Sequence, residues 1–151
     1  MNLPLQSYIR SGQPADMPAV VTLLAAVGLP TADLTQVQRL QMWVAEAADS
    51  LFGVIALEPF GSQALLRSLA VTPGYRKRGL GRELVARVEH EAKAEGIQQL
   101  VLLTETAEAF FLKLGYELTN RTDVREEVKQ SAEFRSLCPV SAVCMTKALR
   151  S

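Results

Sequence analysis

The chain has 151 residues, 48% of them hydrophobic and 21% charged, which is the composition of an ordinary globular domain. Sixteen basic and sixteen acidic residues cancel, which argues against a general attraction to nucleic acid or to an anionic membrane. The sequence has no apolar run long enough for a membrane span, and its first ten residues lack a signal-peptide pattern. We therefore expect one cytoplasmic domain over residues 1–151.

Hydrophobic periodicity alternates between strands and helices along the chain. A short strand is expected near residues 7–12, followed by a helix that has Asp16 as its N-cap and ends at Gly28. The remaining expected elements are a short helix at 33–39, strands at 39–47, 50–59 and 61–73, a helix at 79–95, a strand at 98–105, a helix at 106–116, a strand at 116–120, a helix or lid at 123–135 and a strand at 140–149. This order predicts an α/β layer.

The stretch VTPGYRKRGLGREL joins the strand at 61–73 to the helix at 79–95. A helix start presents unpaired amides and the positive end of the helix dipole, and Gly79 and Gly81 would let an anion approach the backbone. The surrounding cations are Arg76, Lys77, Arg78 and Arg82. The pattern predicts a pyrophosphate site. The alternatives are a solvated basic helix start or a small nucleic-acid patch, while Walker and dinucleotide motifs fit less well.

This stretch resembles the acyl-CoA-binding motif of the GNAT N-acetyltransferase superfamily, with Arg76, Gly79 and Gly81 at the motif positions. A second block, TAEAFFLKLGYEL, resembles the helix and strand that usually read A-x-x-F-Y-x-x-x-G-F. The resemblance extends over nearly the whole chain. It implies an α/β (α+β) GNAT fold, in which a mixed central sheet of about six to seven strands splays between the fourth and fifth strands and about four helices flank it. It also implies acetyl-CoA as co-substrate and no metal.

The resemblance places the acetyl thioester in a V between the strands at 61–73 and 98–105. Backbone groups of the first strand would bind the pantetheine and hold the developing oxyanion while the acceptor amine attacks directly. The residues expected to contact the cofactor are Leu69, Ala70, Val71, Arg76, Lys77, Arg78, Gly79, Leu80, Gly81, Arg82, Thr104 and Phe111.

The sequence departs from the family pattern at two positions that matter for catalysis. Phe111 stands where many relatives carry a tyrosine acid, and Leu65 stands where many carry a glutamate base. No catalytic residue is therefore assigned. Thr104 replaces an asparagine that often contacts CoA. A missing acid is chemically tolerable, because a thiol with a pKa of about 8–9 is a fair leaving group.

The tail SAEFRSLCPVSAVCM resembles the arsenic-resistance-associated N-acetyltransferases, which are described beside amino-acid N-acetyltransferases. This implies a small amine acceptor, such as an amino acid or an amino-acid-like toxin. Arg67 is predicted to pair with an acceptor carboxylate, with a surface arginine as the alternative, and Glu133 is predicted to meet an ammonium group. No nucleic-acid or membrane partner is expected, and the chain would be a monomer or a homodimer.

The two cysteines, Cys138 and Cys144, would lie about 20 Å apart in an extended strand, beyond the roughly 7 Å that a disulfide allows. We expect ordinary reduced thiols, at least one of them buried, which weakens the case for arsenic binding by the pair. Two other functions remain open. One is a CoA-binding sensor or pseudoenzyme, and the other is an acetyltransferase that modifies proteins.

Overall fold

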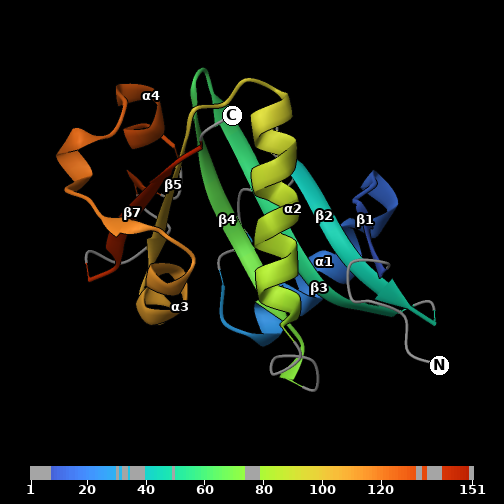
Figure 1. The fold of residues 1–151 in the computed structure, drawn as a ribbon. Coiled ribbons are helices and arrows are strands. Elements are labelled where there is room, and N and C mark those ends of the chain that lie inside the picture. The colour runs from blue at the N-terminus through green and yellow to red at the C-terminus, as the bar shows by residue number, and fades with distance from the viewer. Residues whose placement is uncertain are drawn as a thin grey trace.

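The computed structural model describes residues 8–29, 31, 34, 40–48, 50–73, 79–131, 134–135 and 141–149 (Figure 1). Within these residues a seven-stranded sheet has the order β1-β2-β3-β4-β5-β7-β6. The strands are β1 Ile9–Ser11, β2 Gln41–Ala47, β3 Ser50–Phe60, β4 Gln63–Val71, β5 Gln99–Thr104, β6 Glu117–Leu118 and β7 Val143–Ala148. The α-helices are α1 Met17–Ala26, α2 Leu80–Ala94, α3 Glu108–Lys113 and α4 Glu126–Lys129. The predicted fold class is confirmed.

Two local predictions differ from the structure, and one falls outside it. Asp16 occupies the N-cap position of α1, but its carboxylate makes no cap bond there. The carboxylate instead accepts from the Gln13 amide at 2.7 Å and from Arg10, and these bonds lower the pKa of Asp16 to about 2. The region at 123–135 contains only the single turn α4 as regular α-helix among its described residues. The helix predicted at 33–39 lies almost wholly outside the described residues.

The sheet is covered on both faces, as Figure 1 shows for α2 in front and α1 behind. The apolar stripe of α2, which includes Leu80, Leu84 and Val88, is buried in the main core cluster against one face. On the opposite face, α1 buries Val20 and Leu24 in a second cluster. A third cluster lies farther along that face under α4 and contains Leu65, Val101, Val124, Val128 and Cys144. Strand alternation therefore places Leu65 on the face opposite α2.

The two central strands part from each other after a short paired segment. β4 and β5 run parallel, and their register contains three pairs, Gln63 with Gln99, Ala64 with Leu100 and Leu65 with Val101. Beyond these pairs, β4 stays hydrogen-bonded to β3 as far as Val71, while β5 stays paired with β7 as far as Thr104. The facing edges of β4 and β5 are therefore released from one another, which confirms the predicted splay between the fourth and fifth strands.

A β-bulge lies in β4 at the start of this opening. Ala56 of β3 pairs with Arg67 and Val54 pairs with Ala70, so Ser68 and Leu69 together stand opposite Ile55. Ser68 has φ +60°, a left-handed conformation that is uncommon for residues other than glycine. The bulge therefore turns the backbone of β4 where the strand loses β5 as a partner.

Candidate functional site

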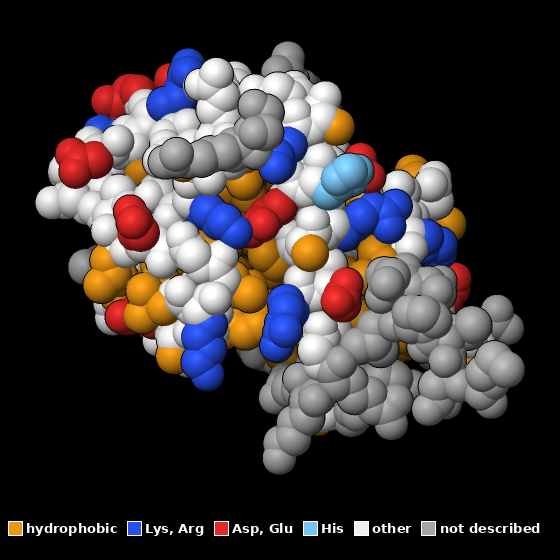
Figure 2. Space-filling model, in the orientation of Figure 1, with side chains coloured by type: hydrophobic (Ala, Val, Ile, Leu, Met, Phe, Trp, Pro, Cys, Tyr) orange, Lys and Arg blue, Asp and Glu red, His pale blue; other side chains and the backbone are white. Residues whose placement is uncertain are grey.

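The V between β4 and β5 has a helix on each side. α2 follows β4 and α3 follows β5, and both lie beside the open end of the V in Figure 1. Figure 2 shows apolar side chains in the hollow between these helices and basic side chains at its rim. The two sides are close at Gly81, where an added Cβ would lie 3.3 Å from Cζ of Phe110. Gly81 therefore accommodates the Phe110 ring, in addition to its predicted role in admitting a phosphate.

The start of α2 has the geometry expected of an anion site. Gly79 is its N-cap with φ +80°, and the Glu83 amide donates to the Gly79 carbonyl at 3.1 Å. The amides of Leu80, Gly81 and Arg82 precede that bond, at the positions where helical amides lack an intrahelical acceptor. The Leu80 side chain is fully buried in the core, so only its backbone is available to a cofactor.

The predicted cations lie partly outside the described residues. Arg82 is exposed on the first turn of α2, whereas Arg76, Lys77 and Arg78 belong to the undescribed segment 74–78. On β4, Leu69 is half-buried, and Ala70 and Val71 are buried. The β4 residues and the start of α2 therefore lie on one side of the V, as predicted.

On the other side of the V, two predicted cofactor residues have roles within the fold. The Thr104 hydroxyl accepts a hydrogen bond from the Ala107 amide at 3.0 Å, at the start of α3. Phe111 is 5% exposed and lies edge-to-face against Phe110 and Tyr116, with centroid separations of 5.0 and 5.2 Å. The ring at the family's tyrosine position thus belongs to the packed core.

A polar network that the sequence analysis did not predict links α2, the end of α3 and β7. The Tyr116 hydroxyl donates to Glu89 at 2.8 Å, and burial together with the Glu89 charge raises the pKa of Tyr116. Lys147 donates to both Glu89 oxygens at 3.1 Å and to the Leu114 carbonyl at 2.8 Å. These residues are far apart in the chain, and no sequence motif connects them.

The predicted acceptor residue Arg67 lies on the sheet face opposite α2. Its side chain is 0% exposed, so the alternative of a surface arginine is wrong. Nη1 of Arg67 donates to Oε1 of Glu58 at 3.2 Å, and the Glu58 side chain is 12% exposed. The sequence analysis missed Glu58, which lies within an apolar strand. The other predicted acceptor residue, Glu133, lies outside the described residues.

One of the two cysteines lies within the described residues. Cys144 is buried beneath α4, and desolvation raises the pKa of its thiol to about 11, which confirms that at least one cysteine is a buried, protonated thiol. Cys138 lies outside the described residues. The described positions contain no cluster of three metal-binding side chains and no helix long and apolar enough to span a membrane.

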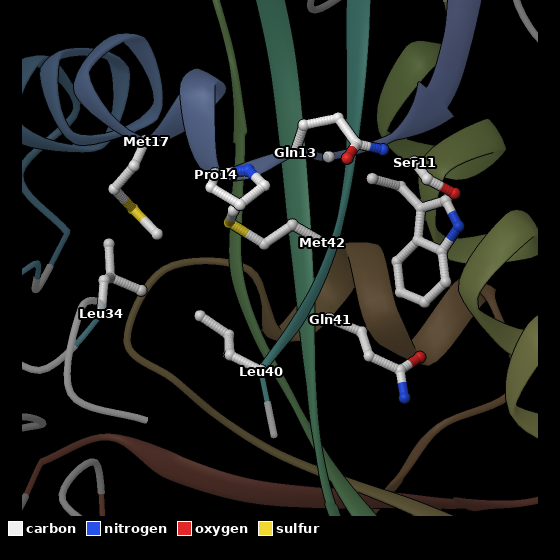
Figure 3. A pocket seen from close by; sticks show the side chains of 10 residues that line it. Ser11, Gln13, Pro14, Met17, Leu34, Leu40, Gln41 and Met42 are labelled. Carbon is white, nitrogen blue, oxygen red and sulfur yellow. The ribbon is translucent and has the colours of Figure 1, made fainter. Parts of the chain in front are cut away.

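A pocket of about 570 Å³ lies at the β1–β2 edge of the sheet (Figure 3). Its lining includes Met17, Leu34, Leu40 and Met42, together with the polar side chains of Gln13 and Gln41. β2 is separated from β4 by β3 in the sheet order, so this pocket is distinct from the V.

Solved structures share this fold. N-acetylglutamate synthase from Neisseria gonorrhoeae, complexed with coenzyme A and N-acetyl-glutamate, aligns with a TM-score of 0.81 and 19% identity over 95% of this chain and 35% of that one. Rv2747 from Mycobacterium tuberculosis, solved in complex with CoA, aligns with a TM-score of 0.76 and 26% identity over 94% of this chain and 99% of that one.

Sequence relatives are similar over part of the chain. Probable N-acetyltransferase 14 of Danio rerio is 31% identical over 96 residues, which are 60% of this chain and 34% of that protein. Amino-acid acetyltransferase of Ectopseudomonas mendocina is 35% identical over 79 residues, 51% of this chain and 18% of that protein. The chain thus spans about a third or less of these relatives. A family model described as an acetyltransferase (GNAT) domain matches residues 38–118, more than half of the chain, and the protein therefore belongs to the GNAT acetyltransferase family.

Proposed function

We propose that this protein transfers the acetyl group of acetyl-CoA to the amine of a small molecule. The observation that carries the proposal is that β4 and β5 separate after the pair Leu65 and Val101. The opening lies beside α2, whose N-cap is Gly79. Open strand edges offer amides and carbonyls to an extended pantetheine, and a helix start offers amides to a pyrophosphate. Relatives named as acetyltransferases and a 26% identical neighbour solved with CoA support this assignment.

In this proposal, the cofactor lies along one side of the V and touches the other. The pantetheine runs along Leu69, Ala70 and Val71. The pyrophosphate meets the amides of residues 79–82, and the cationic side chains around it are Arg76, Lys77, Arg78 and Arg82. Thr104 can still donate its hydroxyl proton, since the bond from Ala107 uses only an acceptor position. Phe111 supplies apolar surface beneath the thioester.

The reaction would depend on position and on backbone electrostatics. An amide of β4 near the bulge at Ser68 and Leu69 polarises the thioester carbonyl and holds the oxyanion as the amine attacks. Holding the amine and the thioester in contact accounts for much of the acceleration. The thiolate of CoA then departs, and its pKa of about 8–9 makes a side-chain acid dispensable.

The acceptor in this proposal is an amino acid or a compound resembling one. The support is the name amino-acid acetyltransferase among relatives that match about half of this chain. Arg67 and Glu133 are the side chains proposed for the acceptor side. The narrower likeness to arsenic-resistance-associated acetyltransferases stays a prediction, as do the cytoplasmic location and a monomeric or homodimeric state. The buried, protonated thiol of Cys144 argues against a direct arsenic ligand at that position.

The test is a screen of amino acids and their analogues for CoA release, with product mass measured in parallel. We expect N-acetylation of one chemical class of amino acid and no release without an acceptor. Binding of acetyl-CoA without turnover of any amine would identify a sensor or pseudoenzyme. Turnover with peptides but not with free amino acids would identify a protein acetyltransferase.

A further inference from the structure

The ion pair between Glu58 and Arg67 lies between two apolar clusters on one face of the sheet. On β3, this face presents Val54 to the cluster under α1 and Phe60 to the cluster under α4, with Glu58 between them. On β4, Arg67 lies in the same way between Leu65 and Ala70. Removing two charges from water costs several kcal/mol per ion before pairing offsets it, so this pair is weak evidence for stability alone.

The pair also lies at the point where the V opens. Glu58 is the direct register partner of Leu65, and Leu65 belongs to the last pair between β4 and β5. Directly opposed residues of an antiparallel pair point to the same face, so Glu58 presents its carboxylate beside the position where Leu65 offers no base. Arg67 immediately precedes the bulge at Ser68 and Leu69, where the proposed function places the thioester.

The two members of the pair differ in access to a substrate. The Arg67 side chain has no exposed surface, whereas Glu58 keeps 12% of its side chain exposed. An acceptor approaching this face would therefore meet the carboxylate first. The guanidinium bonded at 3.2 Å restrains the orientation of that carboxylate.

We propose that Glu58 binds the acceptor ammonium and takes its proton, and that Arg67 is the positioning residue that holds Glu58 in place. The inference rests on the proposed function and deepens it, because it assigns a base where the sequence indicated none. It also changes the predicted role of Arg67. The arginine acts through Glu58 rather than by contacting an acceptor carboxylate.

The ammonium of the acceptor gives one proton to the Glu58 carboxylate and becomes a neutral amine, which attacks the thioester carbonyl. The N–C bond forms, the C–S bond breaks, and the electron pair of that bond leaves on the CoA sulfur. The second proton leaves the new amide nitrogen and ends on the CoA thiolate. Glu58 then releases its proton to water.

The test compares two acceptors in wild type and in Glu58→Gln. The first acceptor is the amino acid found in the screen, and the second is its aminooxy analogue, whose nitrogen is already neutral at neutral pH. With the amino acid, the single-turnover rate should fall by roughly 10²- to 10⁴-fold, the usual contribution of general acid–base catalysis. With the aminooxy analogue, the rate should fall less than about tenfold, because no proton has to be removed before attack.

The matched control is Glu46→Gln. Glu46 is also a strand carboxylate bonded to an arginine, with Arg10 at 3.0 Å, but it lies on β2, away from the V. Its rates should not change. Because Glu58→Gln leaves a buried cation, Glu58→Gln combined with Arg67→Met removes both charges and should show the same contrast between acceptors. Arg67→Lys should slow the amino acid and its methyl ester equally, whereas an arginine that contacted the carboxylate would affect only the amino acid.

Each outcome decides the proposal. A large loss confined to the amino acid supports Glu58 as the base. Equal losses with both acceptors, or no loss with either, overturn it while leaving the proposed function intact, because wild type still acetylates. A screen in which wild type acetylates no amino acid or analogue overturns the proposed function and this assignment together.

Discussion

The two sides of the V are built by different means. The β4–α2 side depends on unusual backbone conformations, with Ser68 at φ +60° in a bulge and Gly79 at φ +80° at the helix start. The β5–α3 side depends on side-chain contacts, among them the Thr104–Ala107 hydrogen bond and the bonds that Tyr116 and Lys147 make across to Glu89 of α2. Substitutions on the first side should therefore act through conformation, and those on the second side through lost contacts.

The largest effect is expected where the two sides meet, at Gly81. In Gly81→Val, the added side chain would press on Phe110, whose Cζ lies 3.3 Å from the position of a Cβ. Overpacking of this kind costs about 1–3 kcal/mol of unfolding free energy, which urea denaturation measures. CoA affinity measured by calorimetry should also fall, because the valine side chain stands beside the amides at the start of α2.

The double variant with Phe110→Ala separates two causes of that loss. Recovery of affinity would show that Gly81 serves the contact with Phe110, and no recovery would show that it serves the approach of the pyrophosphate. Unchanged affinity in Gly81→Val alone would contradict both interpretations and count against the site.

A smaller effect is expected at Gly79, where no atom lies within 4 Å of an added Cβ, so conformation alone is tested. Gly79→Ala must hold alanine at φ +80°, which costs about 1–2 kcal/mol of unfolding free energy. Gly79→Asn should cost less, because asparagine tolerates the left-handed region. Urea unfolding measures both variants, and equal stabilities of the alanine variant and wild type would refute the conformational explanation.

On the β5–α3 side of the V, Tyr116→Phe removes the hydroxyl that donates to Glu89 and leaves the ring packed on Phe111. Lys147 still bonds Glu89, so the loss should be about 0.5–1.5 kcal/mol of unfolding free energy. Lys147→Met alone and in the Tyr116→Phe background completes a double-mutant cycle. Strict additivity would show that the network is not energetically coupled.

The smallest effect is a predicted gain at Ser68. Ser68→Gly should relieve the left-handed backbone strain of Ser68, which is worth about 1–2 kcal/mol. Against this gain, glycine loses more conformational entropy on folding, which costs about 0.5–1 kcal/mol. The net gain in unfolding free energy, measured by urea denaturation, should lie between about 0 and 1.5 kcal/mol. Ser68→Ala keeps a Cβ at the same φ and should show no gain, so a gain in the alanine variant would argue against strain as the cause.

Much of the fold was predictable because it depends on local patterns. Apolar runs bounded by turn residues marked β2 to β5, and the helix predicted at 79–95 corresponds to α2 at Leu80–Ala94. Asp16 occupies the predicted N-cap position of α1, but its carboxylate makes no cap bond there, because it bonds Arg10 of β1 and the Gln13 amide instead. Propensity describes what a residue does beside its sequence neighbours and not beside partners in space.

The sequence by itself determined the order of strands and helices, the family resemblance and the glycines at the start of α2, because each depends on residues close together in the chain. Only the tertiary structure decided that Phe110 occupies the space beside Gly81, that Tyr116 and Lys147 meet on Glu89, and that Glu58 stands opposite Leu65 with Arg67 buried behind it. The register between two strands sets which side chains share a face, and the positions along each strand do not reveal that register.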